Sequence, residues 1–215
     1  MPRKLFGGEI IYISISGVHG IGKSLVARML AKRNGWAYSP EAVDSVIRAP
    51  RFGPRGREKL FAELWHMRQL MSREEWLARN KENVCITDRW WQDVIVYGKI
   101  LLSPKEFRIV ENVVSWIPKA NPDLEVVLWA PDDAVFKKIS ERGRDKGVTW
   151  GDKDLTYIRE VNTGFRSYYD SFKDIRNIAL IEARPVIEET YALVKKIVFK
   201  YVRDRNQKTL DEFKE

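Results

Sequence analysis

Short runs of apolar and β-branched residues alternate along the chain with longer segments in which apolar residues recur every three or four positions. The short runs have the length and composition of buried strands, and the longer segments have the periodicity of helices. The predicted strands are Glu9–Ser16, Trp36–Ser39, Asn83–Asp88, Leu124–Ala130 and Asn177–Ala183. The predicted helices are Lys23–Arg33, Arg57–Asn80, Lys105–Trp116, Asp133–Arg142, Leu155–Phe172 and Pro185–Arg203, with a further helix just after Asp88. This alternation predicts an α/β fold, a parallel sheet of about five strands with helices on both faces.

Local sequence signals give the start of one of these helices and the buried side of another. Ser103 and Pro104 have the residue types of an N-cap and a first helical position. The long helix Arg57–Asn80 carries apolar residues that we expect on one buried side, namely Leu60, Leu64, Met67, Leu70 and Met71. No internal repeat, low-complexity stretch or Ser/Gly-rich linker interrupts the pattern, so we expect a single domain over residues 1–215.

Composition narrows the class of protein. The 215 residues carry a net charge of +8, which suits polyanions such as nucleic acid but also ATP and phosphorylated small molecules. The only cluster of one sign, Arg48–Arg57, contains Gly and Pro and is more typical of a solvated loop than of a nucleic-acid surface. Cys85 is the single cysteine, which excludes an internal disulfide and a cysteine-rich metal site.

The location expected from the sequence is the cytoplasm. No apolar run approaches the ~20 residues that span a bilayer, and the start of the chain lacks the apolar region of a signal peptide. We therefore expect no membrane association. Abundant Lys, Arg and Glu, with few Gln and one Cys, is a composition found in proteins of thermophiles.

The segment Gly17–Ser24 reads GVHGIGKS and matches the phosphate-binding pattern G-x-x-x-x-G-K-[ST]. It follows a predicted strand and opens a predicted helix, which is the context that the pattern requires. Backbone N–H groups of such a loop surround phosphate oxygens, Lys23 would reach the β- and γ-phosphates, and Ser24 would bind Mg²⁺. The residues expected around the phosphates of ATP are Gly17, His19, Gly20, Ile21, Gly22, Lys23, Ser24 and Leu25.

His19, inside this loop, allows two interpretations. Most histidines at such a place simply fill a permissive position of the pattern. The alternative is a side chain directed towards the phosphate acceptor, because this face of the loop borders the transferred phosphate.

A second group of charged residues follows the third predicted strand. Asp88 would organise Mg²⁺ or its waters at the carboxyl end of that strand, and Arg89 would steady phosphoryl oxygens. Asp93 and Tyr97 lie four residues apart on one face of the next helix and complete the pattern D-R-x-x-x-D-x-x-x-Y. We expect this pair to line the opening at the carboxyl edge of the sheet.

Glu41 follows the second predicted strand and would also lie at the carboxyl edge. If the acceptor is a hydroxyl, a carboxylate there would take its proton, whereas a phosphate monoester needs no base. The alternative is a solvated acid at a helix N-terminus.

Two further segments offer candidates for catalysis and binding. The glycine-broken basic segment Glu141–Gly147 would place Arg142 and Arg144 over the transferred phosphate, although arginines are also common at an exposed helix C-terminus. On the long helix, Trp65 and Arg68 belong to an aromatic and polar edge that would stack on and read a base, although aromatics at helical spacing usually belong to a core.

Together these residues resemble the P-loop nucleoside and nucleotide kinases, in particular the thymidylate kinase and deoxynucleoside kinase group. The resemblance covers nearly the whole chain through GVHGIGKS, SPEA, LFAELWHMRQ, ITDRWWQDVIVYG, PDLEVVLWAPDDAVFKKISERGR and IEARPVIEETYALVKKI. It implies a three-layer P-loop fold, ATP with Mg²⁺ as donor, a lid over residues 141–153 that carries Arg142 and Arg144, and a homodimer. It also implies that Arg89 contacts the phosphate or 5′ oxygen of the acceptor.

Several positions depart from the thymidylate kinase pattern. Thymidylate kinases have an acid where His19 stands and an arginine where Pro40 stands, and only Arg68 lies near their base-reading arginine. Deoxynucleoside kinases share the Pro-Glu pair after the second strand but have Glu-Arg in place of Asp88 and Arg89. The pattern that starts at Asp88 also resembles nicotinamide riboside kinase-like proteins.

The sequence therefore predicts a kinase that moves the γ-phosphate of ATP to a nucleoside or a nucleoside monophosphate. The alternatives are an ATP-driven switch that contacts nucleic acid or a protein partner, and a kinase for another small hydroxyl compound such as nicotinamide riboside.

Overall fold

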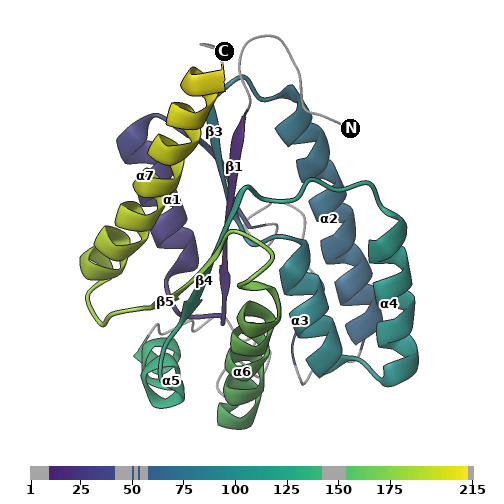
Figure 1. The fold of residues 1–215 in the computed structure, drawn as a ribbon. Coiled ribbons are helices and arrows are strands. Elements are labelled where there is room, and N and C mark those ends of the chain that lie inside the picture. The colour runs from purple at the N-terminus through teal and green to yellow at the C-terminus, as the bar shows by residue number, and fades with distance from the viewer. Residues whose placement is uncertain (1–9, 42–49, 51–52, 54–57, 142–153, 213–215) are drawn as a thin grey trace.

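Five strands form one sheet at the centre of the molecule (Figure 1). The computed structural model describes residues 10–41, 50, 53, 58–141 and 154–212. The strands are β1 (Ile11–Gly17), β2 (Ala37–Ser39), β3 (Val84–Asp88), β4 (Leu124–Trp129) and β5 (Ile178–Glu182). They lie in the order β2-β3-β1-β4-β5, and every neighbouring pair is parallel. All carboxyl ends therefore share one edge of the sheet, with β1 in the middle, and the predicted fold class is confirmed.

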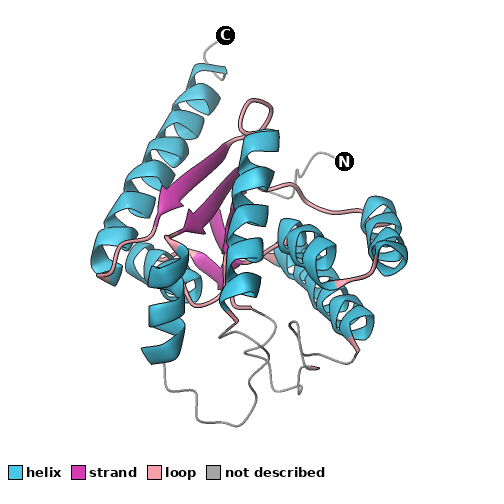
Figure 2. Ribbon diagram, turned by 90° about the horizontal axis from the view of Figure 1, so that it is seen from below, coloured by secondary structure: helices cyan, strands magenta, loops and turns pink. Residues whose placement is uncertain are grey.

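Helices cover both faces of the sheet, as Figures 1 and 2 show. On one face, α1 (Lys23–Asn34) and α7 (Ile187–Glu212) pack together against the strands. On the other face lie α3 (Trp91–Leu101) and α6 (Leu155–Phe172). Outside this inner layer, α2 (Lys59–Arg79) and α4 (Pro104–Trp116) pack on α3 and on each other, and α5 (Asp132–Glu141) packs on α6.

The predicted elements agree with the observed ones to within a few residues at most ends. The cap of α4 is as expected, because the Ser103 hydroxyl accepts a hydrogen bond from the Glu106 amide while the Glu106 carboxylate binds back to Ser103. The last helix is the exception, since α7 continues to Glu212 instead of ending at Arg203. Among the residues that the structure describes, no helix combines the length and apolarity needed to cross a membrane.

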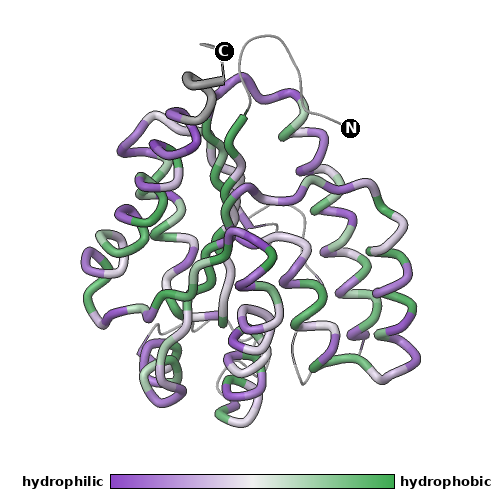
Figure 3. The backbone as a smooth tube through the Cα atoms, viewed as in Figure 1, coloured by the Kyte–Doolittle hydropathy of each residue, from purple (hydrophilic) through white to green (hydrophobic). Residues whose placement is uncertain are grey.

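The two sides of the central strand β1 differ in chemistry. Ile11, Ile13 and Ile15 belong to the apolar cluster that includes residues of α1, α6 and α7. The alternate positions carry Ser14 and Ser16, which are also fully buried and hydrogen-bond to α3 instead. Figure 3 shows the hydrophobic residues concentrated along the strands and the inner sides of the helices. A run that sequence reasoning treated as simply apolar thus presents one apolar and one polar side.

The apolar side expected for α2 is only partly correct. Met67 and Leu70 are buried, but Leu64 is 38% exposed and Met71 is 48% exposed. Their expected places in the interior are taken by Glu63 and Arg73, which are both buried. The helix is rotated because its inner face has to meet the polar carboxyl edge of the sheet as well as the apolar surfaces of α3 and α4.

A substitution at Gly17, the last residue of β1, tests how closely the backbone is packed at the carboxyl edge of the sheet. Its φ of +133° is a conformation that side chains rarely adopt, and a Cβ atom there would collide with the backbone oxygen of Leu128. We expect Gly17→Ala to lower the free energy of unfolding by about 3 kcal/mol. Gly35→Ala is the matched control, because φ is +67° but no atom lies within 4 Å, and the strained conformation alone costs about 1 kcal/mol. Urea unfolding of both variants makes the comparison, and equal losses would contradict the steric explanation.

Candidate active site

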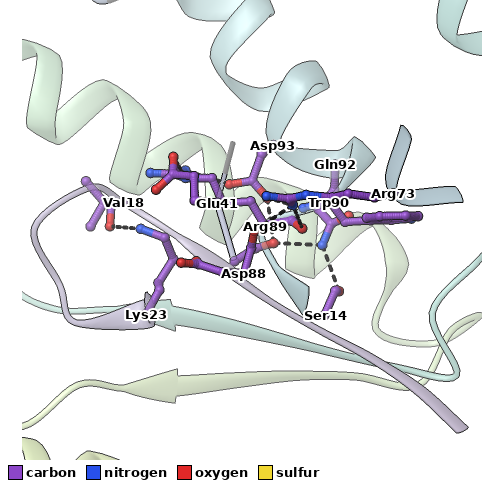
Figure 4. Close-up of polar contacts among 11 residues, drawn as sticks. Ser14, Val18, Lys23, Glu41, Arg73, Asp88, Arg89, Trp90, Gln92 and Asp93 are labelled. Atoms are coloured by element: carbon purple, nitrogen blue, oxygen red, sulfur yellow. Dashed lines mark hydrogen bonds and ion pairs between the residues drawn. The ribbon is translucent and has the colours of Figure 1, made fainter. Parts of the chain in front are cut away.

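The loop between β1 and α1 begins at the carboxyl edge of the sheet, where a phosphate-binding loop is expected. The Lys23 ammonium is buried and donates a hydrogen bond across the loop to the Val18 carbonyl at 2.8 Å (Figure 4). Burial, and next the positive charge of Arg89, lower the pKa of Lys23 to about 7, against the opposing effect of Glu41, Asp88 and Asp93. An anion bound in the loop would restore the full charge of this lysine.

The rest of the loop follows the predicted arrangement around the N-terminus of α1. Gly17, His19, Gly20 and Gly22 lie in the turn that leads into the helix, and the Ile21 side chain is buried beneath it. Leu25 contributes a backbone amide in the first turn of α1, while its side chain is 46% exposed and takes no part in the core. The helix N-terminus therefore adds its positive dipole end to the loop.

Asp88 ends β3 and lies beside β1, where it pairs in register with Ile15. In Figure 4 its carboxylate lies between Lys23 and Arg89. Both carboxylate oxygens are buried and have no hydrogen-bond partner among the described residues. Burial, and next the charge of Glu41, raise the pKa of Asp88, while Lys23 and the Ser24 hydroxyl oppose this rise.

The chemistry of Asp88 and Ser24 fits a magnesium ion. The described part of the chain contains no group of three or more His, Cys, Asp or Glu side chains that would form a protein cage for a metal. Mg²⁺ does not need one, because it is usually held by one or two carboxylates together with phosphate oxygens and water. A buried carboxylate without a partner, next to a phosphate-binding loop, supplies the expected type of ligand.

Arg89 is held between two carboxylates at the same edge. Its Nε lies 2.5 Å from Glu41 Oε1, and its Nη1 donates to Asp93 Oδ1 at 2.7 Å. The backbone φ of Arg89 is +67°, the left-handed region, and its amide donates to the Ile15 carbonyl of β1 at 2.9 Å. This unusual backbone turns the chain sharply from β3 towards α3. Strained backbone of this kind is common at functional sites.

Asp93 and Tyr97 both lie on the face of α3 that meets Arg89, as the four-residue spacing predicts. The Tyr97 ring centre is 5.1 Å from the Arg89 guanidinium carbon, and burial raises the pKa of Tyr97 to about 12. Asp93 Oδ2 accepts hydrogen bonds from the Ser16 hydroxyl at 2.6 Å and from the Trp90 amide. Asp93 thus fixes both the arginine and the start of α3.

Sequence reasoning missed Gln92, the residue before Asp93. Its side-chain amide donates hydrogen bonds to Ser14 at 3.0 Å and to Ser16 at 2.7 Å, so it attaches α3 to the polar side of β1. The available signal was the alternation of Ser with Ile along the first strand, because buried serines need partners.

Arg73 of α2 is the second residue that sequence reasoning missed. Its guanidinium donates hydrogen bonds to the carbonyls of Asp88 at 2.8 Å, Arg89 at 3.2 Å and Pro40. It therefore joins the carboxyl ends of β2 and β3 to the outer helix. An arginine three residues after Leu70, on the buried face of α2, was the signal in the sequence.

The two candidates named on α2, Trp65 and Arg68, differ in their burial. Arg68 is exposed. Trp65 is partly buried and meets the His66 ring edge to face, with ring centres 5.2 Å apart. His66 itself lies near the site, since Glu41, Arg89 and Arg73 all affect its pKa, which burial lowers to about 4.

The His19 side chain packs on α6. Its ring stacks on Tyr157 of α6, with ring centres 5.3 Å apart and planes 25° from parallel. This contact links the phosphate-binding loop to the helix that follows residue 153. Arg142 and Arg144 lie outside the described residues, as does nearly all of the basic cluster Arg48–Arg57, of which only residues 50 and 53 are described.

Comparison with known proteins agrees with this geometry. A family model described as an AAA domain matches residues 12–149, which is more than half of the chain. This span contains the phosphate-binding loop, Glu41 and the segment from Asp88 to Tyr97. No curated protein sequence matches the chain.

Solved structures of deoxyadenosine kinase from M. mycoides share the fold. The structure with the products dCMP and a flexible dCDP has a TM-score of 0.75 and 14% identity, and the match covers 88% of this chain and 100% of that chain. The structure with dCTP has a TM-score of 0.69 and 17% identity, with the same coverage. The structure with dATP has a TM-score of 0.71 and 15% identity, covering 87% of this chain and 99% of that chain. At these identities the likeness is one of fold.

Replacing Arg73 tests whether it holds the carboxyl edge together. We expect Arg73→Met to lower the free energy of unfolding by about 3 kcal/mol, because three backbone carbonyls at the edge lose their donor. Arg79→Met on the same helix is the control and should change stability by less than about 0.5 kcal/mol, since that side chain is exposed. Urea unfolding measures both changes, and equal effects would show that Arg73 contributes no more than a surface arginine.

Proposed function

We propose that this chain, which belongs to the family of AAA domains, is an ATP- and Mg²⁺-dependent kinase of a nucleoside or a nucleoside monophosphate. The observation that carries the proposal is the juxtaposition at one sheet edge of a phosphate-binding lysine, an unpaired buried carboxylate and an arginine held by two further carboxylates. The first two groups suit a phosphate donor, and the third suits an acceptor beside it.

The donor half consists of Lys23, Ser24 and Asp88. Lys23 would exchange its hydrogen bond to the Val18 carbonyl for the β- and γ-phosphates of ATP, while loop amides surround the remaining oxygens. Mg²⁺ held by the Ser24 hydroxyl and the Asp88 carboxylate would neutralise negative charge on the phosphates. The buried position of Asp88 means that bound phosphates and metal would give this carboxylate the partners that the protein itself does not provide.

The acceptor half consists of Glu41, Arg89, Asp93 and Tyr97. Burial raises the pKa of Glu41, but the positive charges of Arg89 and Lys23 outweigh burial and keep the pKa below its usual value. An ionised Glu41 near the transferred phosphate can take the proton of an attacking hydroxyl, and Arg89 can bind the oxygen that it belongs to.

This charge arrangement favours a nucleoside over a nucleoside monophosphate as the acceptor. Arg89 is already neutralised by Glu41 and Asp93, so an incoming phosphate dianion would meet two carboxylates for one guanidinium. A neutral hydroxyl avoids this repulsion. The M. mycoides deoxyadenosine kinase structures hold dATP, dCTP, or dCMP with dCDP, which supports an acceptor of nucleoside size on this fold.

Other predicted features remain part of the proposal. Arg142 and Arg144 would stabilise charge on the transferring phosphate from a lid over residues 141–153, and Trp65 would contact the acceptor base beside His66. The protein would act in the cytoplasm as a homodimer. A nicotinamide riboside is included among the acceptors because it offers the same kind of primary hydroxyl.

The test is incubation with ATP and Mg²⁺ and a panel of nucleosides, nucleoside monophosphates and nicotinamide riboside, with products identified by mass. We expect phosphorylated nucleoside from the native protein, and a loss of about a thousandfold in rate for Lys23→Ala, because the charge on the phosphates loses its partner. Lys137→Ala, which removes an exposed side chain of α5, is the control and should retain the native rate.

Two outcomes would contradict the proposal. Undiminished activity of Lys23→Ala would exclude the loop as the donor site. ATP hydrolysis with no phosphorylated product from any acceptor would favour a switch that couples ATP to a macromolecular partner.

Glu41→Gln tests the role of the carboxylate as a base. We expect the turnover number with a nucleoside to fall by about a hundredfold or more, because the amide cannot accept the hydroxyl proton. The KM for ATP should stay within about twofold, since Glu41 does not belong to the donor half. Glu75→Gln, an exposed acid of α2, is the control. A turnover number unchanged by Glu41→Gln would sink the base role.

A further inference from the structure

Glu63 is a buried carboxyl that neither half of the proposed mechanism uses. It lies near the start of α2, is 1% exposed, and its Oε1 has no hydrogen-bond partner among the described residues. Buried polar groups in folded proteins are nearly always paired, so a carboxyl left in this state needs an explanation. Among the residues that the structure describes, Asp88 is the other buried carboxyl with unpaired oxygens, and the metal and phosphate site proposed above accounts for it.

The position of Glu63 relates it to the acceptor side of the site. Arg73, further along the same helix, reaches the carboxyl ends of β2 and β3, and Leu70 and His66 lie between the two on the inner face. Ten residues of helix separate Glu63 from Arg73, which is about 15 Å along the axis. Figure 1 shows α2 running alongside α3, and the two helices pack on each other. The charges of Asp93 and Arg89 both act on the Glu63 carboxyl, so Glu63 lies on the side of the edge where Arg89 lies.

The charges that face Glu63 come from α3 and from the end of β3. Burial raises the pKa of Glu63 well above its usual value, the charge of Asp93 raises it further, and Arg89 opposes them. Burial and the charge of Asp93 thus favour the protonated, neutral form of this carboxyl. A neutral carboxyl has a hydroxyl donor beside a carbonyl acceptor, whereas a carboxylate can only accept.

We propose that Glu63 determines acceptor specificity by pairing with a polar edge of the acceptor that offers a hydrogen-bond donor next to a hydrogen-bond acceptor. Such edges occur on the amide or amidine side of a nucleobase and on a carboxamide. The proposal rests on the kinase function proposed above and extends it from the phosphorylated hydroxyl to the far end of the acceptor. Pairing would satisfy the carboxyl that the protein leaves unpaired, and a site of this kind rejects analogues that lack the matching group.

Two substitutions separate this role from a purely structural one. Glu63→Gln keeps a donor beside an acceptor, so we expect the KM for the best nucleoside of the panel to change by less than about threefold. Glu63→Leu removes both groups while keeping similar volume, and we expect that KM to rise by about tenfold or more. The KM for ATP should be unchanged in both variants. Glu75→Gln on the exposed face of α2 is the control for loss of an acid.

A nucleoside analogue identifies the contact itself. Replacing the exocyclic amino or oxo group of the base by hydrogen should weaken binding to the native protein about tenfold and leave binding to Glu63→Leu unaltered. Isothermal calorimetry with the native nucleoside and the analogue gives all four affinities without relying on turnover. Equal effects of the analogue on the native protein and on Glu63→Leu would overturn the proposal.

The remaining outcomes also decide the question. A KM unchanged in Glu63→Leu, together with higher thermal stability, would show that Glu63 is only a buried group that weakens the fold. Loss of nucleoside affinity in Glu63→Gln as large as in Glu63→Leu would show that a charged carboxylate is required, which overturns a neutral pairing. If the native protein binds nucleosides and Glu63→Leu does not, but no phosphorylated product forms, the kinase function fails while Glu63 as a binding residue stands.

Discussion

The ion-paired guanidinium of Arg89 is the constraint on which the carboxyl edge of the sheet depends. It joins Glu41, which follows β2, to Asp93 of α3, while the amide of the same residue binds β1. A buried guanidinium is tolerated only when its charge is matched, and because two carboxylates share that role here, the loss of both would leave an unpaired charge in the interior. The left-handed backbone at Arg89 is maintained by these contacts. The direction in which the chain leaves β3, and therefore the place of α3, follows from the same interaction.

The strand that carries the phosphate-binding loop is itself fixed by polar contacts to α3. Ser14 and Ser16 lie on one side of β1 and bind Gln92 and Asp93, so β1, Arg89 and the start of α3 are joined in one hydrogen-bonded network. Arg73 adds α2 to this network through the carbonyls at the ends of β2 and β3. A polar network inside the fold is favourable only when its members are paired, and here the pairing also fixes the relative positions of β1, Arg89 and α3.

The charges at the edge divide into two sets. Arg89 is neutralised within the protein, and Arg73 is tied to backbone carbonyls, whereas Lys23 has only a carbonyl partner and Asp88 has none among the described residues. The groups left to find partners in a ligand are therefore one cation and one anion on the proposed donor side. On the proposed acceptor side, the buried carboxyl of Glu63 is the corresponding group. Under the proposed kinase function, this division of charges would favour a neutral acceptor over a second phosphate.

Patterns along the chain were enough to predict the architecture and to identify the phosphate-binding loop. Apolar periodicity placed the strands and helices, and the spacing of Gly17, Gly22, Lys23 and Ser24 identified the loop, because both signals are local along the chain. The four-residue spacing of Asp93 and Tyr97 gave their shared face for the same reason.

Three features could be found only in the folded protein: the rotation of α2, the stacking of His19 on Tyr157, and the burial of Glu63 and Arg73 where Leu64 and Met71 were expected. Each of these depends on which surface an element meets. That surface is built from residues far away in the sequence, here the ends of β2 and β3 and the start of α3. Periodicity along one helix shows that a face is buried, but a polar edge of a sheet can make a charged residue the better one to bury, and no local pattern records that edge.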